Sequence, residues 1–209
     1  MDADDIAAAR RRLAALDPAL KRADAQTPPY DWRRQAPGFE GLVRIMIGQQ
    51  ISTRAAAAIF ERCRTVLGRL APDVVLAASH ETLRACGLAG RKIGQVQNLA
   101  AEVVRGDLDF AALATLDDQS AILRLTARPG VGPWTAQIYL LFAEGRQDLC
   151  PEGDLALREA LRMAEGGVEP ISPQAFARRA EAWSPDRGHA AHLLWAYYAV
   201  RQSTRDSRG

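Results

Sequence analysis

The sequence predicts an all-α protein built from many short helices. Apolar residues recur at helical spacing along most of the 209 residues, and prolines and glycines interrupt this pattern repeatedly. The alternation of apolar and polar residues that marks a half-buried strand is weak throughout. We expect helices, in chain order, at residues 4–24 with a break at Pro18, 39–47, 53–67, 72–78, 81–86, 92–105, 113–116, 120–127, 134–143, 154–163, 173–183 and 187–201.

Start and stop residues support these helix boundaries. The apolar segment FEGLVRIMI at 39–47 ends at Gly48. Ser52 or Thr53 can cap the next helix with a side-chain oxygen, and Gly68 provides its C-terminal stop. Further along the chain, the amphipathic segments are separated by glycines at 87, 90 and 106.

Composition places the chain among ordinary soluble globular proteins. It is 48% hydrophobic and 25% charged, with a mean hydropathy of −0.17 and a net charge of +2. No apolar run approaches the ~20 residues of a membrane helix, and the acidic start lacks the apolar stretch of a secretory leader. Three widely spaced cysteines, Cys63, Cys86 and Cys150, match neither a disulfide framework nor a zinc site. We therefore expect a cytoplasmic protein.

The segment from Leu125 to Ala143 predicts a tight turn between two helices. Pro133 falls at or near the first position of the second helix, where proline fits best. Gly130 and Gly132 let backbone amides approach a ligand closely at a helix N-terminus, where an anion is favoured. A phosphate of a DNA strand fits such a site without many lysines. The alternative is a simple connection between two helices.

Asp154 is the candidate catalytic group. It follows a loop of proline and glycine and opens an amphipathic helix, so it also has the features of an ordinary N-cap. A carboxylate held there can stabilise the oxocarbenium-like sugar that forms when an N-glycosidic bond breaks, and can orient the attacking water. Asp148 and Glu152 compete for this role, but we expect them to be held less rigidly.

Three segments resemble, in order and spacing, the helix-hairpin-helix superfamily of DNA glycosylases: LVRIMIGQQIS at 42–52, RPGVGPWTA at 128–136 and DLCPEGD at 148–154. The likeness is greatest to the alkylbase branch, the 3-methyladenine DNA glycosylase II type. It implies the HhH-GPD glycosylase fold, a two-lobed bundle of helices. The implied division is an N-terminal helical segment and connector at 1–35, a glycosylase domain at 36–203 and a frayed tail at 204–209.

The resemblance implies roles for individual residues. Asp154 matches the catalytic aspartate, and Gln50 matches the residue that fills the gap left by the extruded base. Trp134 matches an aromatic wall of the base pocket, and Trp195 matches a second pocket tryptophan. Ile138 stands where the family has a further pocket aromatic. A core role for the two tryptophans and a helix-capping role for Gln50 stay open. DNA-binding roles are implied for Gly130, Val131, Gly132, Arg128 and Thr135, with Arg54 and Arg91 as neighbouring arginines, and the backbone carbonyls of Thr126, Arg128 and Val131 correspond to a site for Na⁺ or K⁺.

Departures from the family pattern narrow the expected chemistry. Members that form a Schiff base with the sugar carry a lysine where this chain has Trp134, and lysine occurs here only as Lys21 and Lys92. Members with an iron–sulfur cluster need four cysteines near the C-terminus, and none follows Cys150. We therefore expect a monofunctional glycosylase that needs no cofactor and removes alkylated purines from damaged double-stranded DNA. We also expect it to be a nucleoid-associated monomer without a membrane partner.

Three other interpretations stay open. A glycosylase for uracil, mismatched or deaminated bases would need polar contacts to a neutral base, and no Asn/His pair stands near Asp154 or Trp134. A non-catalytic helix-hairpin-helix module would bind DNA or a protein without chemistry, against which Asp154 at the expected spacing argues. A helical scaffold without any DNA role agrees best with the small net charge.

Overall fold

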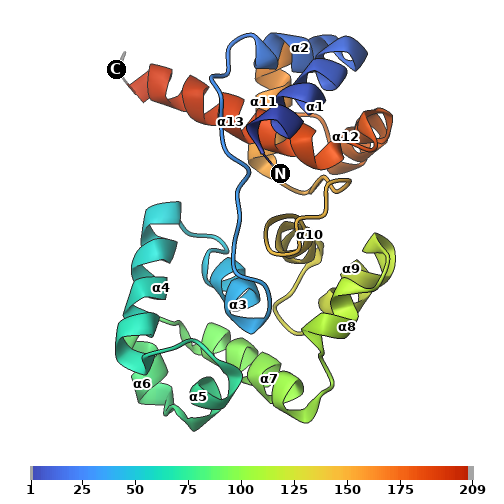
Figure 1. Ribbon diagram of the computed structural model, residues 1–209. Helices are drawn as coiled ribbons and strands as arrows, with labels where there is room; N and C mark the ends of the chain where they lie inside the picture. Colours follow the sequence, from blue (N-terminus) through green and yellow to red (C-terminus); the bar gives the residue numbers. More distant parts are fainter. Residues whose placement is uncertain (1, 207–209) are drawn as a thin grey trace. The chain divides into compact units, whose positions relative to one another are not determined.

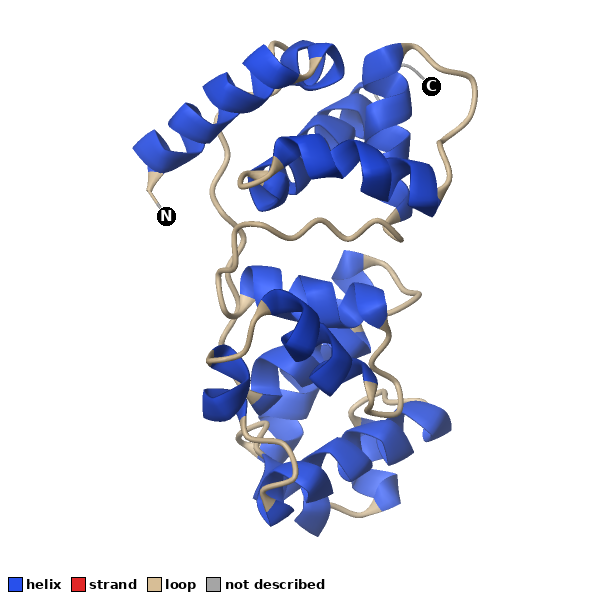
Figure 2. Ribbon diagram, turned by 90° about the vertical axis from the view of Figure 1, so that its right-hand side faces the viewer, coloured by secondary structure: helices blue, strands red, loops and turns tan. Residues whose placement is uncertain are grey.

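A computed structural model describes residues 2–206, and every regular element in that range is a helix (Figure 1; Figure 2). The predicted all-α fold class is therefore confirmed. None of these helices combines the length and apolar character needed to span a bilayer. The helices are α1 (Ala3–Leu16), α2 (Pro18–Asp24), α3 (Phe39–Ile47), α4 (Thr53–Leu67), α5 (Pro72–Ala77), α6 (His80–Ala85), α7 (Gly90–Arg105), α8 (Phe110–Ala114), α9 (Asp118–Thr126), α10 (Pro133–Phe142), α11 (Leu155–Glu165), α12 (Pro173–Ala180), a 3₁₀ turn (Glu181–Trp183) and α13 (Arg187–Asp206).

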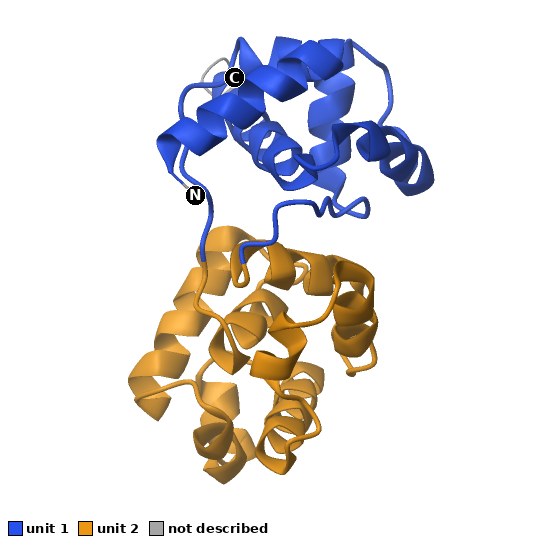
Figure 3. Ribbon diagram, turned by 45° about the vertical axis from the view of Figure 1, so that its right-hand side comes forward, with its two compact units in different colours: residues 1–34, 145–209 blue, residues 35–144 orange. Residues whose placement is uncertain are grey.

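The chain forms two compact units, coloured separately in Figure 3. Unit 1 consists of Met1–Arg34 and Gly145–Gly209, and unit 2 consists of Gln35–Glu144. Unit 1 therefore holds α1, α2 and α11–α13, whereas unit 2 holds α3–α10. The chain enters unit 2 at Gln35, and the N-terminal helices belong to the same unit as the C-terminal ones. The expected division between residues 1–35 and 36–203 stays a prediction.

Unit 1 is organised around the buried carboxylate of Asp17. Asp17 caps α2 by accepting a hydrogen bond from the Ala19 amide at 2.8 Å. It also accepts two bonds from the Arg179 guanidinium, at 2.8 and 2.9 Å, and one from the Trp183 indole at 3.0 Å. Burial alone would raise the pKa of Asp17, but these hydrogen bonds outweigh it and lower the pKa. Asp17 thus ties the start of α2 to α12 and the 3₁₀ turn.

Unit 2 is built around α3, which contacts α4, α7 and α10. Seven of its nine residues are buried, as the apolar sequence predicts. Gly41 is required there, because a Cβ at this position would lie 1.9 Å from the Ala36 carbonyl oxygen. The same entry segment is tied to α10, since the Gly38 amide donates to the buried Tyr139 hydroxyl at 2.9 Å. These contacts hold α10 beside α3.

Most helix boundaries agree with the prediction, including Ser52 as the cap of α4 and Gly68 after its end. Three differ. Helix α7 begins at Gly90 rather than Lys92, and α8 spans Phe110–Ala114 because Asp109 caps it through bonds to two backbone amides. Helix α13 continues to Asp206, so residues 204–206 are helical where we expected a frayed tail; residues 207–209 lie outside the described range.

Candidate functional site

Helices α9 and α10 form the predicted turn between two helices. Gly130 has a φ of +87°, a left-handed conformation that glycine adopts without strain. The Val131 amide donates to the Arg128 carbonyl at 3.0 Å and closes the turn. Helix α10 follows with Pro133 in its first turn and the exposed Gly132 as N-cap, where a Cβ would meet open space. The start of α10 is therefore open to a ligand, and its amides favour an anion.

Two residues expected to bind DNA, Thr135 and Arg128, have side chains that are bound to other residues of unit 2. Thr135 is 2% exposed, and its Oγ1 accepts a hydrogen bond from Gln49 at 2.7 Å. The Arg128 side chain is 10% exposed; it pairs with Glu102 at 2.9 Å and donates to the Asp107 carbonyl at 3.0 Å. These partners hold both side chains within unit 2, which leaves the backbone at each position for a contact to DNA. The DNA-binding roles of Arg128 and Thr135 stay predictions.

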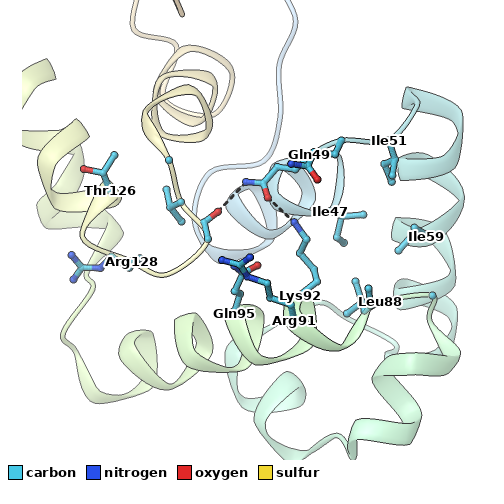
Figure 4. Close-up of a pocket in the computed structure, with 16 residues that line it drawn as sticks. Ile47, Gln49, Ile51, Ile59, Leu88, Arg91, Lys92, Gln95, Thr126 and Arg128 are labelled. Atoms are coloured by element: carbon cyan, nitrogen blue, oxygen red, sulfur yellow. Dashed lines mark hydrogen bonds between the residues drawn. The ribbon is translucent and has the colours of Figure 1, made fainter. Parts of the chain in front are cut away.

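A chain of hydrogen bonds joins the turn to α3 and α7 (Figure 4). Lys92 Nζ donates to the Met46 carbonyl and to Gln49 Oε1, both at 2.6 Å. Gln49 Nε2 in turn donates to the Gly130 carbonyl at 2.9 Å and to Thr135 Oγ1 at 2.7 Å. The orientation of the Gln49 amide is unambiguous, because an amine donates to its oxygen and a carbonyl accepts from its nitrogen.

This network lines a pocket of about 780 Å³ within unit 2. Gln50 and Arg91 are exposed residues of its lining. Gln50 has a φ of +63°, and a left-handed conformation costs a residue with a side chain about 1–2 kcal/mol. Strain of this kind persists where the surrounding structure imposes it, often at binding sites. The conformation is compatible with the implied gap-filling role of Gln50, which stays a prediction.

The implied cation site also stays a prediction. Thr126 ends α9, and Arg128 and Val131 lie in the turn that follows. The Arg128 carbonyl accepts the Val131 amide, but a carbonyl oxygen has a second lone pair that a cation can use. Within residues 2–206 we find no cluster of His, Cys, Asp and Glu side chains suited to a metal ion, which does not bear on a site made of carbonyls.

Asp154 lies in unit 1 and caps α11. Its carboxylate accepts a hydrogen bond from the Leu157 amide at 3.1 Å, and the residue is partly exposed. The predicted N-cap is confirmed, and negative charge is favoured at such a helix start. Arg33, which sequence reasoning missed, lies within electrostatic reach. Partial removal from water lowers the pKa of Arg33, and the charge of Asp154 opposes that shift.

The competing carboxylate Asp148 is held rigidly, contrary to expectation. Arg187 donates to both of its oxygens, at 2.8 and 3.0 Å, and the Ser184 hydroxyl donates at 2.7 Å. Burial would raise the pKa of Asp148, but the bonds from Arg187 and Ser184 outweigh it and lower the pKa. Asp148 therefore has a structural role, joining the loop before α11 to the start of α13, which leaves Asp154 as the better catalytic candidate.

Trp195 is packed within unit 1. It is 6% exposed, and its ring meets the edge of His192 at 5.6 Å between centroids, while the Arg33 guanidinium lies 5.4 Å from its centre. His192 stacks on Trp32 at 3.8 Å, and burial lowers the pKa of His192 to about 3. Of the other two implied pocket residues, Ile138 is buried and Trp134 is partly exposed on α10. The pocket roles of all three stay predictions.

A family model of the "HhH-GPD superfamily base excision DNA repair protein" matches residues 43–185. This chain belongs to the HhH-GPD superfamily. The match covers both the turn at Gly130 and the helix that Asp154 caps, so the resemblance drawn from the sequence motifs is confirmed.

The HhH-GPD chain has curated and structural relatives. It is 29% identical over 174 residues to DNA-3-methyladenine glycosylase 1 of Schizosaccharomyces pombe, covering 81% of this chain and 76% of that protein. It is 31% identical over 190 residues to a probable bifunctional transcriptional activator/DNA repair enzyme AlkA of Mycobacterium tuberculosis, of which it spans only 37%. The structure resembles that of the S. pombe 3-methyladenine DNA glycosylase in complex with abasic DNA, with a TM-score of 0.82, 28% identity and coverage of 90% and 94% of the two chains.

Sequence reasoning missed three residues of this HhH-GPD protein: Gln49, Lys92 and Arg33. Lys92 could have been singled out, because a chain that uses arginine almost everywhere else keeps a lysine here. A compact ammonium can reach oxygens of two separate elements, which the planar guanidinium of arginine does less readily. Gln49 offered no comparable indication, since only the fold brings it to Gly130.

Proposed function

We propose that this HhH-GPD protein is a monofunctional DNA glycosylase that hydrolyses the N-glycosidic bond of alkylated purines in double-stranded DNA. The observation that carries the proposal is Asp154, a carboxylate fixed at the start of α11 inside the segment matched by the repair family. Similarity to the sequence and to the solved structure of an S. pombe 3-methyladenine DNA glycosylase supports alkylated purines as the substrate class.

In the proposed reaction, the two units contribute different functions. The amides at the start of α10 bind a backbone phosphate and position the DNA. The damaged nucleotide leaves the stack at a cost of a few kcal/mol, which is least for a damaged pair, and Gln50 fills the gap. Asp154 stabilises the positive charge that develops on the sugar and orients the water. An alkylated purine is already cationic and leaves readily, so no strong general acid is needed.

The absence of lyase chemistry is part of the proposal, and the placement of the lysines supports it. Trp134 occupies the position at which lyase members carry their lysine. Lys92 is engaged by the Met46 carbonyl and Gln49, and Lys21 is exposed on α2. Borohydride treatment during turnover should therefore trap no covalent protein–DNA adduct, whereas a trapped adduct would contradict a monofunctional mechanism.

The activity is tested with duplexes that contain 3-methyladenine, 7-methylguanine, hypoxanthine or uracil, scoring the released base. Release of a methylated purine supports the proposal. One observation favours a second candidate: the Arg33 guanidinium over Trp195 places a positive charge against an implied pocket residue and would disfavour a cationic base there. Release of hypoxanthine or uracil alone would select that deaminated-base glycosylase, and duplex binding without any release would select a non-catalytic module.

A further inference from the structure

We propose that Lys92 and Gln49 form a clamp that holds the turn at Gly130 in its phosphate-binding conformation, and that Lys92 acts through this clamp without touching DNA. The clamp consists of three hydrogen bonds that run from Lys92 through the Gln49 amide to Gly130 and Thr135, and of a fourth from Lys92 to the Met46 carbonyl. Figure 4 draws the Lys92–Gln49 and Gln49–Gly130 bonds. The inference rests on the proposed binding of DNA by the turn, and it makes Lys92 and Gln49 positioning residues of that site.

The Gln49 amide sets the geometry of the phosphate site because it donates one hydrogen bond to the turn and one to the start of α10, the two segments that form this site. One bond ends on the Gly130 carbonyl in the turn, and the other ends on Thr135 in the first turn of α10. The peptide plane is rigid, so fixing the Gly130 carbonyl also fixes the direction of the next amide. The turn and the helix start are thereby held relative to each other before DNA arrives.

Lys92 in turn orients Gln49. Its Nζ bonds Gln49 Oε1 and the Met46 carbonyl near the end of α3, where helix carbonyls lack intrahelical donors and a positive group is favoured. Partial burial and the neighbouring Arg91 lower the pKa of Lys92. Charged and neutral amines both carry at least two N–H bonds, so the clamp does not depend on its protonation state.

The clamp is also connected through the backbone to Gln50, the residue expected to fill the gap left by the extruded base. Gln50 directly follows Gln49 and holds its left-handed φ of +63° at the surface of the same pocket. With the Gln49 side chain anchored at Gly130, the backbone that presents Gln50 is anchored to the turn as well. The Gln49 side chain would therefore position both the turn that binds phosphate and the residue that fills the gap.

Salt dependence separates a clamp from a direct phosphate contact. Lys92→Met keeps the length of the side chain and removes its donors, and Arg91→Met is the matched control, because Arg91 is the exposed neighbour that lines the same pocket. We measure the dissociation constant for a duplex with an abasic-site analogue across a salt series. Lys92→Met should raise the dissociation constant Kd about tenfold and leave the slope of log Kd against log[salt] unchanged. Arg91→Met should instead reduce this slope by about 1, because one phosphate contact is lost. A slope lowered by about 1 in Lys92→Met, or unchanged affinity, overturns the proposal.

A double-mutant cycle tests whether the two residues act together. If Lys92 works only through Gln49, Lys92→Met/Gln49→Met should bind DNA no more weakly than Gln49→Met alone. Additive losses would contradict the clamp. Gln49→Met, made on its own in a partly exposed loop residue, also keeps the proposal testable if Lys92→Met fails to fold.

Amide hydrogen exchange of the free protein needs no DNA and tests the clamp even if the proposed function fails. Exchange across residues 128–136 should rise at least several-fold in Lys92→Met and Gln49→Met, and stay unchanged in Arg91→Met. Unchanged exchange in both clamp variants overturns the proposal. Failure of the wild-type protein to bind duplex DNA would instead overturn the proposed function, and the clamp would still be judged by exchange.

Discussion

Replacing Asp154 by asparagine and by alanine should separate its two roles. Asparagine keeps an oxygen that can accept the Leu157 amide, so the cap of α11 should survive with a loss of only a few tenths of a kcal/mol. Alanine removes the cap and should cost about 1 kcal/mol, or roughly 2–4 °C in melting temperature for a chain of this size. Both substitutions remove the negative charge. If that charge stabilises the sugar cation, base release should fall about 10²–10³-fold in each variant.

The measurement pairs single-turnover base release, with enzyme in excess over a methylated duplex, with thermal unfolding. The catalytic interpretation expects the asparagine variant to melt close to the wild type and still lose base release, while DNA binding is retained. Base release within threefold of the wild type in Asp154→Asn would refute it. A loss confined to Asp154→Ala would show that Asp154 matters only as a helix cap.

Three further predictions concern the turn, the core of unit 1 and the strained residue Gln50. Gly132→Asp should weaken duplex binding at least tenfold in a salt-dependent way, whereas the neutral Gly132→Asn should bind more nearly as the wild type does, because both side chains enter open space and both cap a helix well. Asp17→Asn should lower the free energy of unfolding by about 2 kcal/mol at pH 7, because it removes the charge that accepts the Arg179 hydrogen bonds, while Arg179 keeps Glu165 as a partner. The pKa of Asp17 is lowered in the folded protein, so its stabilisation is present above its ordinary value of 3.8 and lost as the pH falls through the folded pKa. Gln50→Gly should unfold at a temperature equal to or above that of Gln50→Ala, because glycine relieves the left-handed strain, while both variants lose the side chain that fills the gap and release base more slowly.

Specific results would contradict each of these three. Equal affinities of the Asp and Asn variants at Gly132 would mean that no phosphate approaches the start of α10. A stability difference between wild type and Asp17→Asn that does not shrink as the pH falls below 3.8 in urea unfolding would contradict the lowered pKa. Full base release by both variants of Gln50 would remove its gap-filling role.

Much of the fold could be predicted because its determinants are local. The periodic apolar residues of 39–47 predicted α3, and Ser52 with Gly68 delimited α4, since these effects act within one helical turn of the residue concerned. The turn at Gly130 followed from backbone conformation alone. Where a local cue was overlooked, as with the cap Asp109, the predicted position of α8 was wrong.

The tertiary structure decided which partners the side chains of Arg128 and Asp148 bind. Arg128 was expected to face DNA, but α7 brings Glu102 to it. Asp148 was expected to be loosely held, but Arg187, 39 residues away in the sequence, pairs with it. The partner of a side chain depends on which distant segments pack beside it, and no local pattern encodes that.

The sequence by itself determined the all-α class, the turn between α9 and α10 and the position of Asp154 as a helix cap, since all three depend on neighbouring residues. Only the tertiary structure decided what supports the turn. Lys92 and Gln49 are 43 residues apart, and they meet Gly130 because α3 packs against both α7 and α10. Helix packing therefore brings these supporting side chains to the turn, whereas the local sequence accounts for its shape.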